Sequence, residues 1–335
     1  MNNAHSLLID CDTGIDDALA LLYLALDPSV DIRAVTTVGG NIDPLRAADN
    51  SGRVLRLAGR GDVPVHVGAE HTLGAARHEY APEIHGHNGL GDVELPELTP
   101  FGERPAAAEE LVRLARRSPG RHHLLALGPL TNLANALRLE PRLPELLAGI
   151  TVMGGAIRRQ GNATPRAEAN VHNDPEAART VLHAGGNLTL VPLDVTMTET
   201  LDEAAHAELV GANSPVTDFA AAILAYYLDF YETRYGSRRA ACHDPLAAAI
   251  AVGDLAEVGT EELALDVRTL PGPERGATVL DTRSEHSAGG HSPTVRVVTR
   301  TSGTFGTRLC ERLRSADART YAEPAVHPRT TTERR

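Results

Sequence analysis

Leu7-Leu8-Ile9-Asp10-Cys11-Asp12-Thr13-Gly14-Ile15-Asp16-Asp17 is the stretch of this 335-residue chain that indicates its fold. The apolar run at 6–9 predicts a buried β-strand, and the apolar pattern over 15–26 predicts a helix directly after it. Four carboxylates fall within these few residues, where the strand meets the helix. We therefore expect an acidic cluster at a strand–helix junction.

The same alternation of short apolar runs and helical patterns continues along the chain. Strands are predicted at 32–38, 63–67, 123–127, 150–153 and 188–191, and helices at 44–57, 106–117, 130–139 and 175–184. This order predicts a single large Rossmann-like α/β domain over 1–321, with a mostly parallel mixed sheet and helices on both faces. The active site is then expected at the carboxyl ends of the strands.

Three segments interrupt this regular pattern. Residues 70–99 are rich in His, Gly and Pro, and residues 213–241 begin with a long helical pattern and end in a polar loop. Long loops in a compact domain are usually functional lids or disordered, and both alternatives apply to these two segments. Residues 322–335 are polar and contain proline, and are predicted to be a disordered tail.

Composition excludes several classes of protein. All 32 basic residues are arginine, so Schiff-base lysine enzymes, P-loop NTPases and protein kinases, which each need a lysine, are excluded. The net charge of −12 opposes binding to a nucleic acid polymer and permits binding of cations and small molecules. The three widely spaced cysteines are predicted to be reduced thiols. No signal peptide or membrane span is predicted, which favours a cytoplasmic protein.

The acidic cluster has two explanations. Thr13 with Asp16 fits a helix capping box, and acids in a first helical turn favour the helix dipole. Capping does not explain Asp10 and Asp12, at the end of an apolar strand. Carboxylates this close repel one another unless a cation neutralises them, and their hard oxygens suit Ca²⁺ or Mg²⁺. We therefore favour a metal or substrate site.

Further motifs along the chain lie where a Rossmann-like fold places the residues of its active site. They are Val38-Gly39-Gly40-Asn41, Ile84-His85-Gly86-His87-Asn88-Gly89, Leu127-Gly128-Pro129-Leu130-Thr131-Asn132, Met153-Gly154-Gly155, Gly161-Asn162, Ala167-Glu168-Ala169-Asn170 and His243-Asp244-Pro245. With the acidic opening, this ordered set resembles the calcium-dependent nucleoside hydrolases of the inosine–uridine preferring type. The resemblance covers about 7–252 and is looser beyond that.

The resemblance implies an enzyme that hydrolyses the N-glycosidic bond of ribonucleosides to free base and ribose. It implies one Ca²⁺ per subunit and a homodimer or homotetramer. By position, the calcium ligands would be Asp12, Asp17, Asp244 and the carbonyl of Leu127. The resemblance also implies several further roles: Asp16, Asn41, Asn162, Glu168 and Asn170 in ribose binding, His85 near the base, His243 as acid to the leaving group, and Asp10 as support for the metal site. Because Ca²⁺ acidifies water only weakly, an adjacent carboxylate must take the proton, and our hypothesis is that Asp12 is this catalytic base.

Two positions depart from the family pattern, and two other functions compete. Ala169 stands where the family commonly has phenylalanine, and His87 where it often has glutamate. A haloacid dehalogenase-like phosphatase would also begin with Asp10 and Asp12, but it requires a later lysine that this chain lacks. A non-catalytic ribose- or calcium-binding protein is the other alternative. The sequence does not select purine or pyrimidine as the preferred base.

Overall fold

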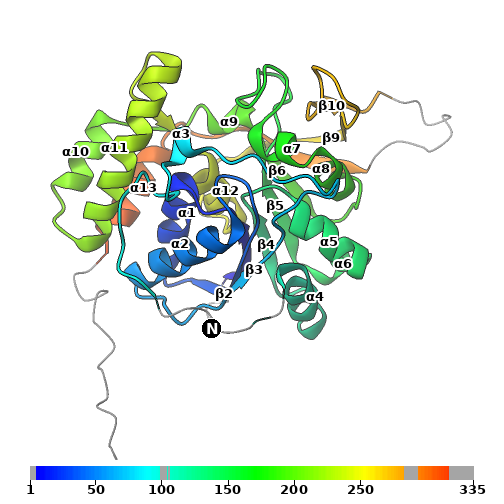
Figure 1. Cartoon of the computed structure of the whole chain (residues 1–335), viewed down its shortest axis with the longest axis horizontal. Coiled ribbons are helices and arrows are strands. Elements are labelled where there is room, and N and C mark those ends of the chain that lie inside the picture. The colour runs from blue at the N-terminus through cyan, green and yellow to red at the C-terminus, as the bar shows by residue number, and fades with distance from the viewer. Residues whose placement is uncertain (1–4, 99–103, 105, 283–292, 317–335) are drawn as a thin grey trace, which may run out of the picture.

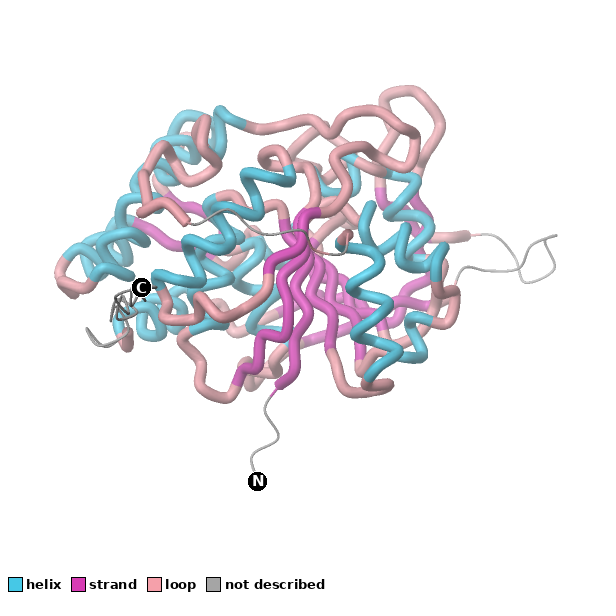
Figure 2. The backbone as a smooth tube through the Cα atoms, turned by 60° about the horizontal axis from the view of Figure 1, so that its bottom comes forward, coloured by secondary structure: helices cyan, strands magenta, loops and turns pink. Residues whose placement is uncertain are grey.

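A nine-stranded mixed sheet forms the centre of the protein in the computed structural model, which describes residues 5–98, 104, 106–282 and 293–316. The strand order is β10-β9-β11-β6-β5-β4-β1-β2-β3. The strands are β1 (His5–Cys11), β2 (Val30–Thr37), β3 (Val65–Val67), β4 (His123–Ala126), β5 (Gly149–Met153), β6 (Leu188–Val191), β9 (Gly259–Val267), β10 (Thr278–Leu280) and β11 (Thr294–Arg300). From β11 to β3 neighbouring strands run parallel, whereas β9 is antiparallel to β10 and β11. Figure 2 shows these strands as a twisted fan.

Helices cover both faces of the sheet. Figure 1 shows one group beside β1 and β2 and another beside β4 and β5. The first group is α1 (Ile15–Ala25), α2 (Pro44–Leu57), α11 (Pro215–Tyr235), α12 (His243–Ala251) and α13 (Phe305–Arg314). The second is α4 (Ala107–Arg117), α5 (Thr131–Leu139), α6 (Leu143–Leu146) and α8 (Pro175–Leu182). The remaining elements are α3 (Pro82–His85), α7 (Ala169–Asn173), α9 (Leu193–Thr196), α10 (Glu203–Val210) and the antiparallel pair β7 (Thr200–Asp202) and β8 (Arg239–Ala241).

Strand β1 joins the two halves of the hydrophobic core. Successive strand side chains point to opposite faces of a sheet. Leu7 and Ile9 therefore belong to the core under α1 and α12, and Leu8 to the core under α4 and α5. All three side chains are fully buried. Burial on both faces explains why this strand is apolar almost throughout, as expected for the interior of a parallel sheet.

The predicted strands and helices between 6 and 191 are all present, and 44–57 and 188–191 match without change. The mostly parallel mixed sheet is confirmed. Sequence analysis did not predict β9, β10, β11 or α13. Much of β9 faces solvent and contains polar residues, so the segment lacks the continuous apolar run of a buried strand. The tail predicted at 322–335 lies outside the described residues.

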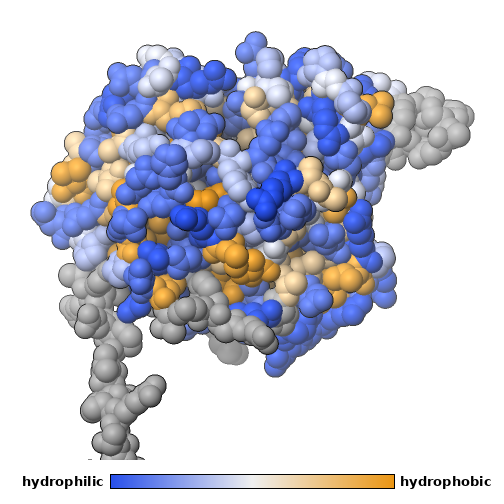
Figure 3. Space-filling model, in the orientation of Figure 1, coloured by the Kyte–Doolittle hydropathy of each residue, from blue (hydrophilic) through white to orange (hydrophobic). Residues whose placement is uncertain are grey.

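The surface carries few large apolar groups. On the face shown in Figure 3, hydrophilic residues predominate and hydrophobic residues form separate groups between them. Exposed large side chains such as Leu45, Leu139 and Val210 come from different helices. No helix among the described residues is long and apolar enough to cross a membrane. The three cysteines are buried free thiols, as predicted.

Candidate functional site

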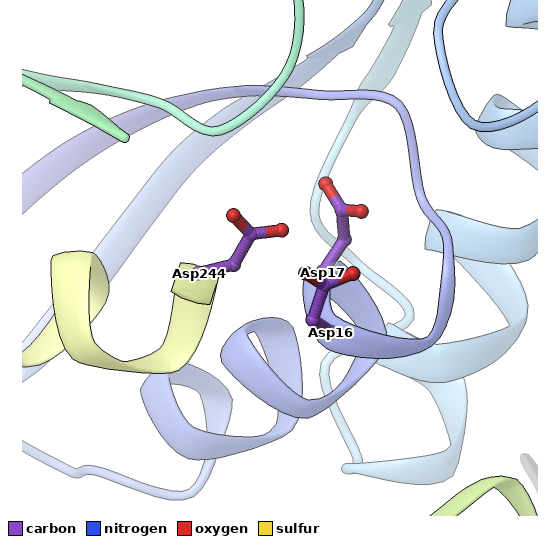
Figure 4. A group of neighbouring side chains, drawn as sticks. All are labelled: Asp16, Asp17 and Asp244. Atoms are coloured by element: carbon purple, nitrogen blue, oxygen red, sulfur yellow. The ribbon is translucent and has the colours of Figure 1, made fainter. Parts of the chain in front are cut away.

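The site lies where the carboxyl ends of the parallel strands meet the first turns of two helices. Asp16 and Asp17 stand in the first turn of α1, and Asp244 stands in the first turn of α12. Each offers a carboxylate oxygen within 4.8 Å of the others, and all three side chains are buried. Figure 4 shows Asp244 opposite the two aspartates of α1. Contacts between α1 and α12 bring residues 16 and 244 together, although 228 positions of sequence separate them.

Asp12 lies beside this group, at the end of β1. Its Oδ2 accepts a hydrogen bond of 2.6 Å from the backbone N–H of Asn41. Glycines make room for its carboxylate, because a Cβ at residue 40 would lie 2.0 Å from Asp12 Oδ2, and one at residue 128 would lie 2.9 Å from Oδ1. Asp12 Oδ1 and Asp16 Oδ1 are buried and have no hydrogen-bond partner. Buried polar atoms are normally satisfied, so these two oxygens are available to a ligand.

Burial and mutual repulsion raise the pKa values of the carboxyl groups in this cluster. Burial raises the pKa of Asp16 and of Asp17 to about 6. Burial, with the charge of Asp17 second, raises the pKa of Asp12, and burial followed by the charge of Asp16 raises that of Asp244. Four carboxylates are therefore costly to keep ionised here without a positive charge among them. Carboxylate oxygens are also the donors that hard divalent cations prefer, so the residues present fit such an ion.

The capping explanation is partly wrong. Gly14, not Thr13, is the N-cap of α1, and its backbone N–H donates to Asp17 Oδ2 over 2.9 Å. Thr13 instead hydrogen-bonds through its hydroxyl to Ser51 and to the Cys11 thiol. One oxygen of Asp17 thus caps the helix.

Asn41 and Asn170 link the strand ends to the acidic group. The Asn41 side chain donates to Asp17 Oδ2 over 3.1 Å. Asn170, in α7, donates to the carbonyl of Leu127 over 2.6 Å. The Leu127 carbonyl that the family resemblance makes a metal ligand therefore has a hydrogen-bond partner in this structure.

The other predicted sugar-binding residues hold the segment 155–171 in place. Glu168 is buried and accepts hydrogen bonds from the backbone N–H groups of Gly155, Asn170 and Val171. Burial raises its pKa despite these bonds. Asn162 Oδ1 accepts from the backbone N–H of Ala169 over 2.9 Å. Both side chains therefore shape this wall of the site, in addition to any contact with substrate.

Two buried histidines line the pocket together with the acidic residues. His85 Nδ1 accepts a hydrogen bond of 3.1 Å from the backbone N–H of Ile15, so its Nε2 carries the ring proton when the ring is neutral. Burial lowers the pKa of His85 to about 4. His243 is engaged at both nitrogens, with Thr196 Oγ1 2.7 Å from Nδ1 and the Tyr231 hydroxyl 3.0 Å from Nε2. Burial lowers its pKa to about 3.

These residues surround a pocket of about 470 Å³. Its lining includes aromatic side chains of α11, among them Tyr227, Phe230 and Tyr231, and polar and small side chains from 162–173. Tyr227 and Tyr231 pack edge to face, with ring centroids 5.0 Å apart. The volume is in the range of small-molecule sites, and a lining that combines aromatic and polar groups suits a ligand with a flat ring and a polyhydroxylated part.

Comparisons with known proteins agree with this geometry. A family described as "Inosine-uridine preferring nucleoside hydrolase" matches residues 7–304. The chain is 36% identical over 244 residues to a probable uridine nucleosidase 2 of Oryza sativa subsp. japonica, covering 72% of each chain. It is 35% identical to the pyrimidine-specific ribonucleoside hydrolase RihA of Citrobacter koseri, covering 73% of this chain and 78% of the relative. The chain belongs to this family.

Solved structures extend the likeness to the C-terminal strands. A plant nucleoside hydrolase, PpNRh1, superposes with a TM-score of 0.85 at 29% identity, covering 93% of this chain and 99% of that one. A purine-preferring ribonucleoside hydrolase from Gardnerella vaginalis gives a TM-score of 0.85 at 28% identity, covering 92% and 98%. This chain is therefore a nucleoside hydrolase, and the family match runs past residue 252, where the sequence motifs end.

The nucleoside hydrolase site contains residues that the sequence motifs did not single out. Phe230 and Arg234 line its pocket, and the hydroxyl of Thr196 hydrogen-bonds His243. Thr196 follows β6, so the expectation that functional residues follow strand ends could have identified it. The two α11 residues follow no strand, and their helical spacing is also that of ordinary packing. Ala169 is exposed to the pocket, and His87 does not line it.

Asp10, near the end of β1, supports this site. Its Oδ1 accepts hydrogen bonds from Thr36 Oγ1 over 2.6 Å and from Asn132 Nδ2 over 2.8 Å. Asn132 also donates to the carbonyl of Thr37 and accepts from the backbone of Ala69. Asp10 thereby links β1 to β2 and to the first turn of α5, two residues before Asp12. Burial raises its pKa from 3.8 to about 7.

This raised pKa predicts how stability depends on pH. The folded state binds the Asp10 proton more tightly than the unfolded state, so its contribution is complete below pH 4 and is lost as the pH rises through about 7. We expect wild type to lose on the order of 2–4 kcal/mol relative to Asp10→Asn between pH 4 and 8. Urea unfolding of both proteins in chelator measures this difference. Parallel pH profiles for the two proteins would show that Asp10 is not the titrating group.

Proposed function

We propose that this nucleoside hydrolase cleaves ribonucleosides with the help of one Ca²⁺ per subunit. Asp12, Asp17, Asp244 and the Leu127 carbonyl would hold the ion. The supporting observation is the buried group of carboxylates at 16, 17 and 244, with unpartnered oxygens on Asp12 and Asp16 beside it. A divalent cation would relieve their mutual repulsion, would orient the sugar diol and would increase the acidity of water.

The chain's own residues supply the remaining chemistry. We assign Asp12 as the general base, because its Oδ1 is unpartnered and its Oδ2 is fixed by the Asn41 backbone. Asp16, Asn41, Asn162, Glu168 and Asn170 form the ribose-binding set. Cleaving the C1′–N bond leaves positive charge on the sugar, which the surrounding carboxylates stabilise, as they do in O-glycosidases.

The leaving base needs a proton as it departs. We assign this role to His243, whose Nε2 hydrogen-bonds the Tyr231 hydroxyl at the pocket wall. Proton donation by a positioned side chain contributes typically ~10²–10⁴-fold to a rate. We assign His85, whose neutral ring carries its proton on Nε2, to contact with the base.

For the base itself, we propose a pyrimidine, with uridine as the preferred substrate. The curated relatives named above are a uridine nucleosidase and a pyrimidine-specific hydrolase. The aromatic wall of α11 provides a surface on which a flat base can stack. We also propose a cytoplasmic homodimer or homotetramer, and light scattering of the purified protein measures its oligomeric state.

A panel of substrates with and without chelator tests this function. Uridine, cytidine, inosine and adenosine are incubated with the enzyme, and free base and reducing sugar are measured. We expect uridine to be the best substrate and chelation to lower its turnover by at least about 100-fold, with recovery on adding Ca²⁺. Full activity after exhaustive chelation would contradict the proposed metal requirement.

The same preparation separates the competing functions. Release of phosphate from p-nitrophenyl phosphate without cleavage of any nucleoside would favour the phosphatase. Calorimetric binding of uridine or Ca²⁺ without turnover of any nucleoside would favour a binding protein. Cleavage of inosine faster than uridine would overturn the assigned base preference and leave the ribohydrolase assignment in place.

A further inference from the structure

His243 is held at both ring nitrogens by hydroxyl groups. Thr196 Oγ1 lies 2.7 Å from Nδ1, and the Tyr231 hydroxyl lies 3.0 Å from Nε2. The two hydroxyl groups differ in position. Tyr231 lines the pocket together with His243, whereas Thr196 does not line it. Thr196 is fully buried in α9, directly after β6. It can therefore act on a substrate only through the histidine.

From this geometry, and on the proposed role of His243, we infer that Thr196 is a positioning residue for the reaction. Its hydroxyl engages Nδ1 and so leaves Nε2 as the nitrogen that exchanges a proton at the pocket. A hydroxyl suits this task because its oxygen can accept a hydrogen bond from a protonated Nδ1. The contact also fixes the rotation of the ring, since a flipped imidazole would place carbon atoms against both hydroxyls.

The proton balance shows why an acceptor is needed at Nδ1. The neutral ring first takes up a proton from solvent, and the imidazolium then gives its Nε2 proton to the departing base nitrogen and returns to the neutral Nδ1–H tautomer. The C1′–N bonding pair leaves with the base and receives that proton. Nδ1 carries a hydrogen both before and after the transfer, in a place without solvent. Thr196 Oγ1 accepts that hydrogen at both stages, as the group behind a catalytic histidine does in other enzymes.

The alternative is that Thr196 has a purely structural role. Substrates with different leaving groups distinguish this role from the positioning of a proton donor. If Thr196 only satisfied a buried histidine, its loss would affect all substrates alike. If it positions a proton donor, its loss will affect substrates in proportion to their need for that proton. Uridine has a poor leaving group, 5-fluorouridine a more acidic one, and p-nitrophenyl β-D-ribofuranoside one that leaves without protonation. The three compounds keep the same ribose.

Thr196→Val removes the hydroxyl and keeps the size of the side chain, and Thr196→Ser keeps the hydroxyl. Thr198→Val is the matched control, because Thr198 lies on the same segment but donates to the backbone carbonyl of Val195 over 2.7 Å. We expect Thr196→Val to lower kcat for uridine by about 10–100-fold, with a smaller loss for 5-fluorouridine and less than about twofold for the nitrophenyl riboside. Thr196→Ser should recover most of the uridine activity.

Three results decide the matter. Equal losses of Thr196→Val on all three substrates, or a loss matched by Thr198→Val, would overturn the positioning role. Wild-type activity of Thr196→Val on uridine would also overturn it. Thermal unfolding in the presence of Ca²⁺ shows whether a variant is folded. If Thr196→Val is not, Thr196→Ala, which also lacks the hydroxyl, replaces it, and equal losses of that variant on all three substrates would overturn the inference. A wild-type enzyme inactive on every nucleoside would instead contradict the proposed function.

Discussion

2′-Deoxyuridine will be hydrolysed about 10⁴-fold less efficiently than uridine, as kcat/KM. A site built to hydrogen-bond a hydroxyl loses this much when the hydroxyl is missing, because its own buried polar atoms are then left unpaired. Asp16 Oδ1 is such an atom, since it is buried and unpartnered in the structure. Asn41 stands beside it, at the oxygens of Asp12 and Asp17.

The measurement compares the two substrates under matched conditions and adds one variant. Asp16→Asn replaces an acceptor oxygen with a donor, and should lower activity on uridine far more than on 2′-deoxyuridine. The ratio of the two efficiencies should therefore shrink in the variant. Equal efficiencies of the wild-type enzyme on uridine and 2′-deoxyuridine would contradict recognition of the sugar diol at these acids. A large ratio that Asp16→Asn leaves unchanged would place the recognition on other residues.

The parallel part of the fold was predictable because its signals are local. Strand β1 is buried on both faces, and the residues after it change abruptly from apolar to acidic. The antiparallel extension was not predictable in the same way. Strand β9 is largely exposed and β10 has three residues, and short, exposed strands carry a weak periodic signal.

For the site, position after a strand identified most of the residues but not their contacts. The family resemblance grouped Asp12, Asp17 and Asp244 as metal ligands and assigned Asp16 to the sugar. In the structure the oxygens closest to one another belong to Asp16, Asp17 and Asp244, with Asp12 alongside. Neighbouring residues in the first turn of a helix point in different directions, and which of them faces α12 depends on how the two helices pack. That packing is a tertiary property which no local pattern records.

The hydrogen bond between Thr196 and His243 could not be predicted from the sequence for a similar reason. Thr196 and His243 are separated by 47 positions, and their hydrogen bond depends on the end of α9 lying beside the start of α12. A threonine after a strand is common and usually serves as a turn or cap residue. Only the 2.7 Å contact with Nδ1 distinguishes it.

Asp12→Asn should lower kcat by about 10³-fold or more while leaving the protein folded. An amide has the size of a carboxylate, and its oxygen can still accept the hydrogen bond from the Asn41 backbone, so the surroundings of Gly40 and Gly128 need not move. The variant also removes one of several buried like charges. Metal-free Asp12→Asn should therefore unfold at the same or a higher temperature than metal-free wild type, because burial and the charge of Asp17 disfavour ionised Asp12 in the fold.

Activity and stability should thus change in opposite directions, which distinguishes a lost base from a damaged fold. Asp62→Asn, at a carboxylate that is mostly exposed, is the control and should change neither. Added Ca²⁺ should raise the unfolding temperature of wild type, as any ligand of the folded state does, and should raise that of Asp12→Asn less, since one ligand has lost its charge. Near-normal kcat in Asp12→Asn would remove Asp12 from the role of base. If Asp12→Asn unfolded at a lower temperature than wild type in chelator, the Asp12 carboxylate would be stabilising the fold. The repulsion between the buried carboxylates would then be smaller than we infer from their burial.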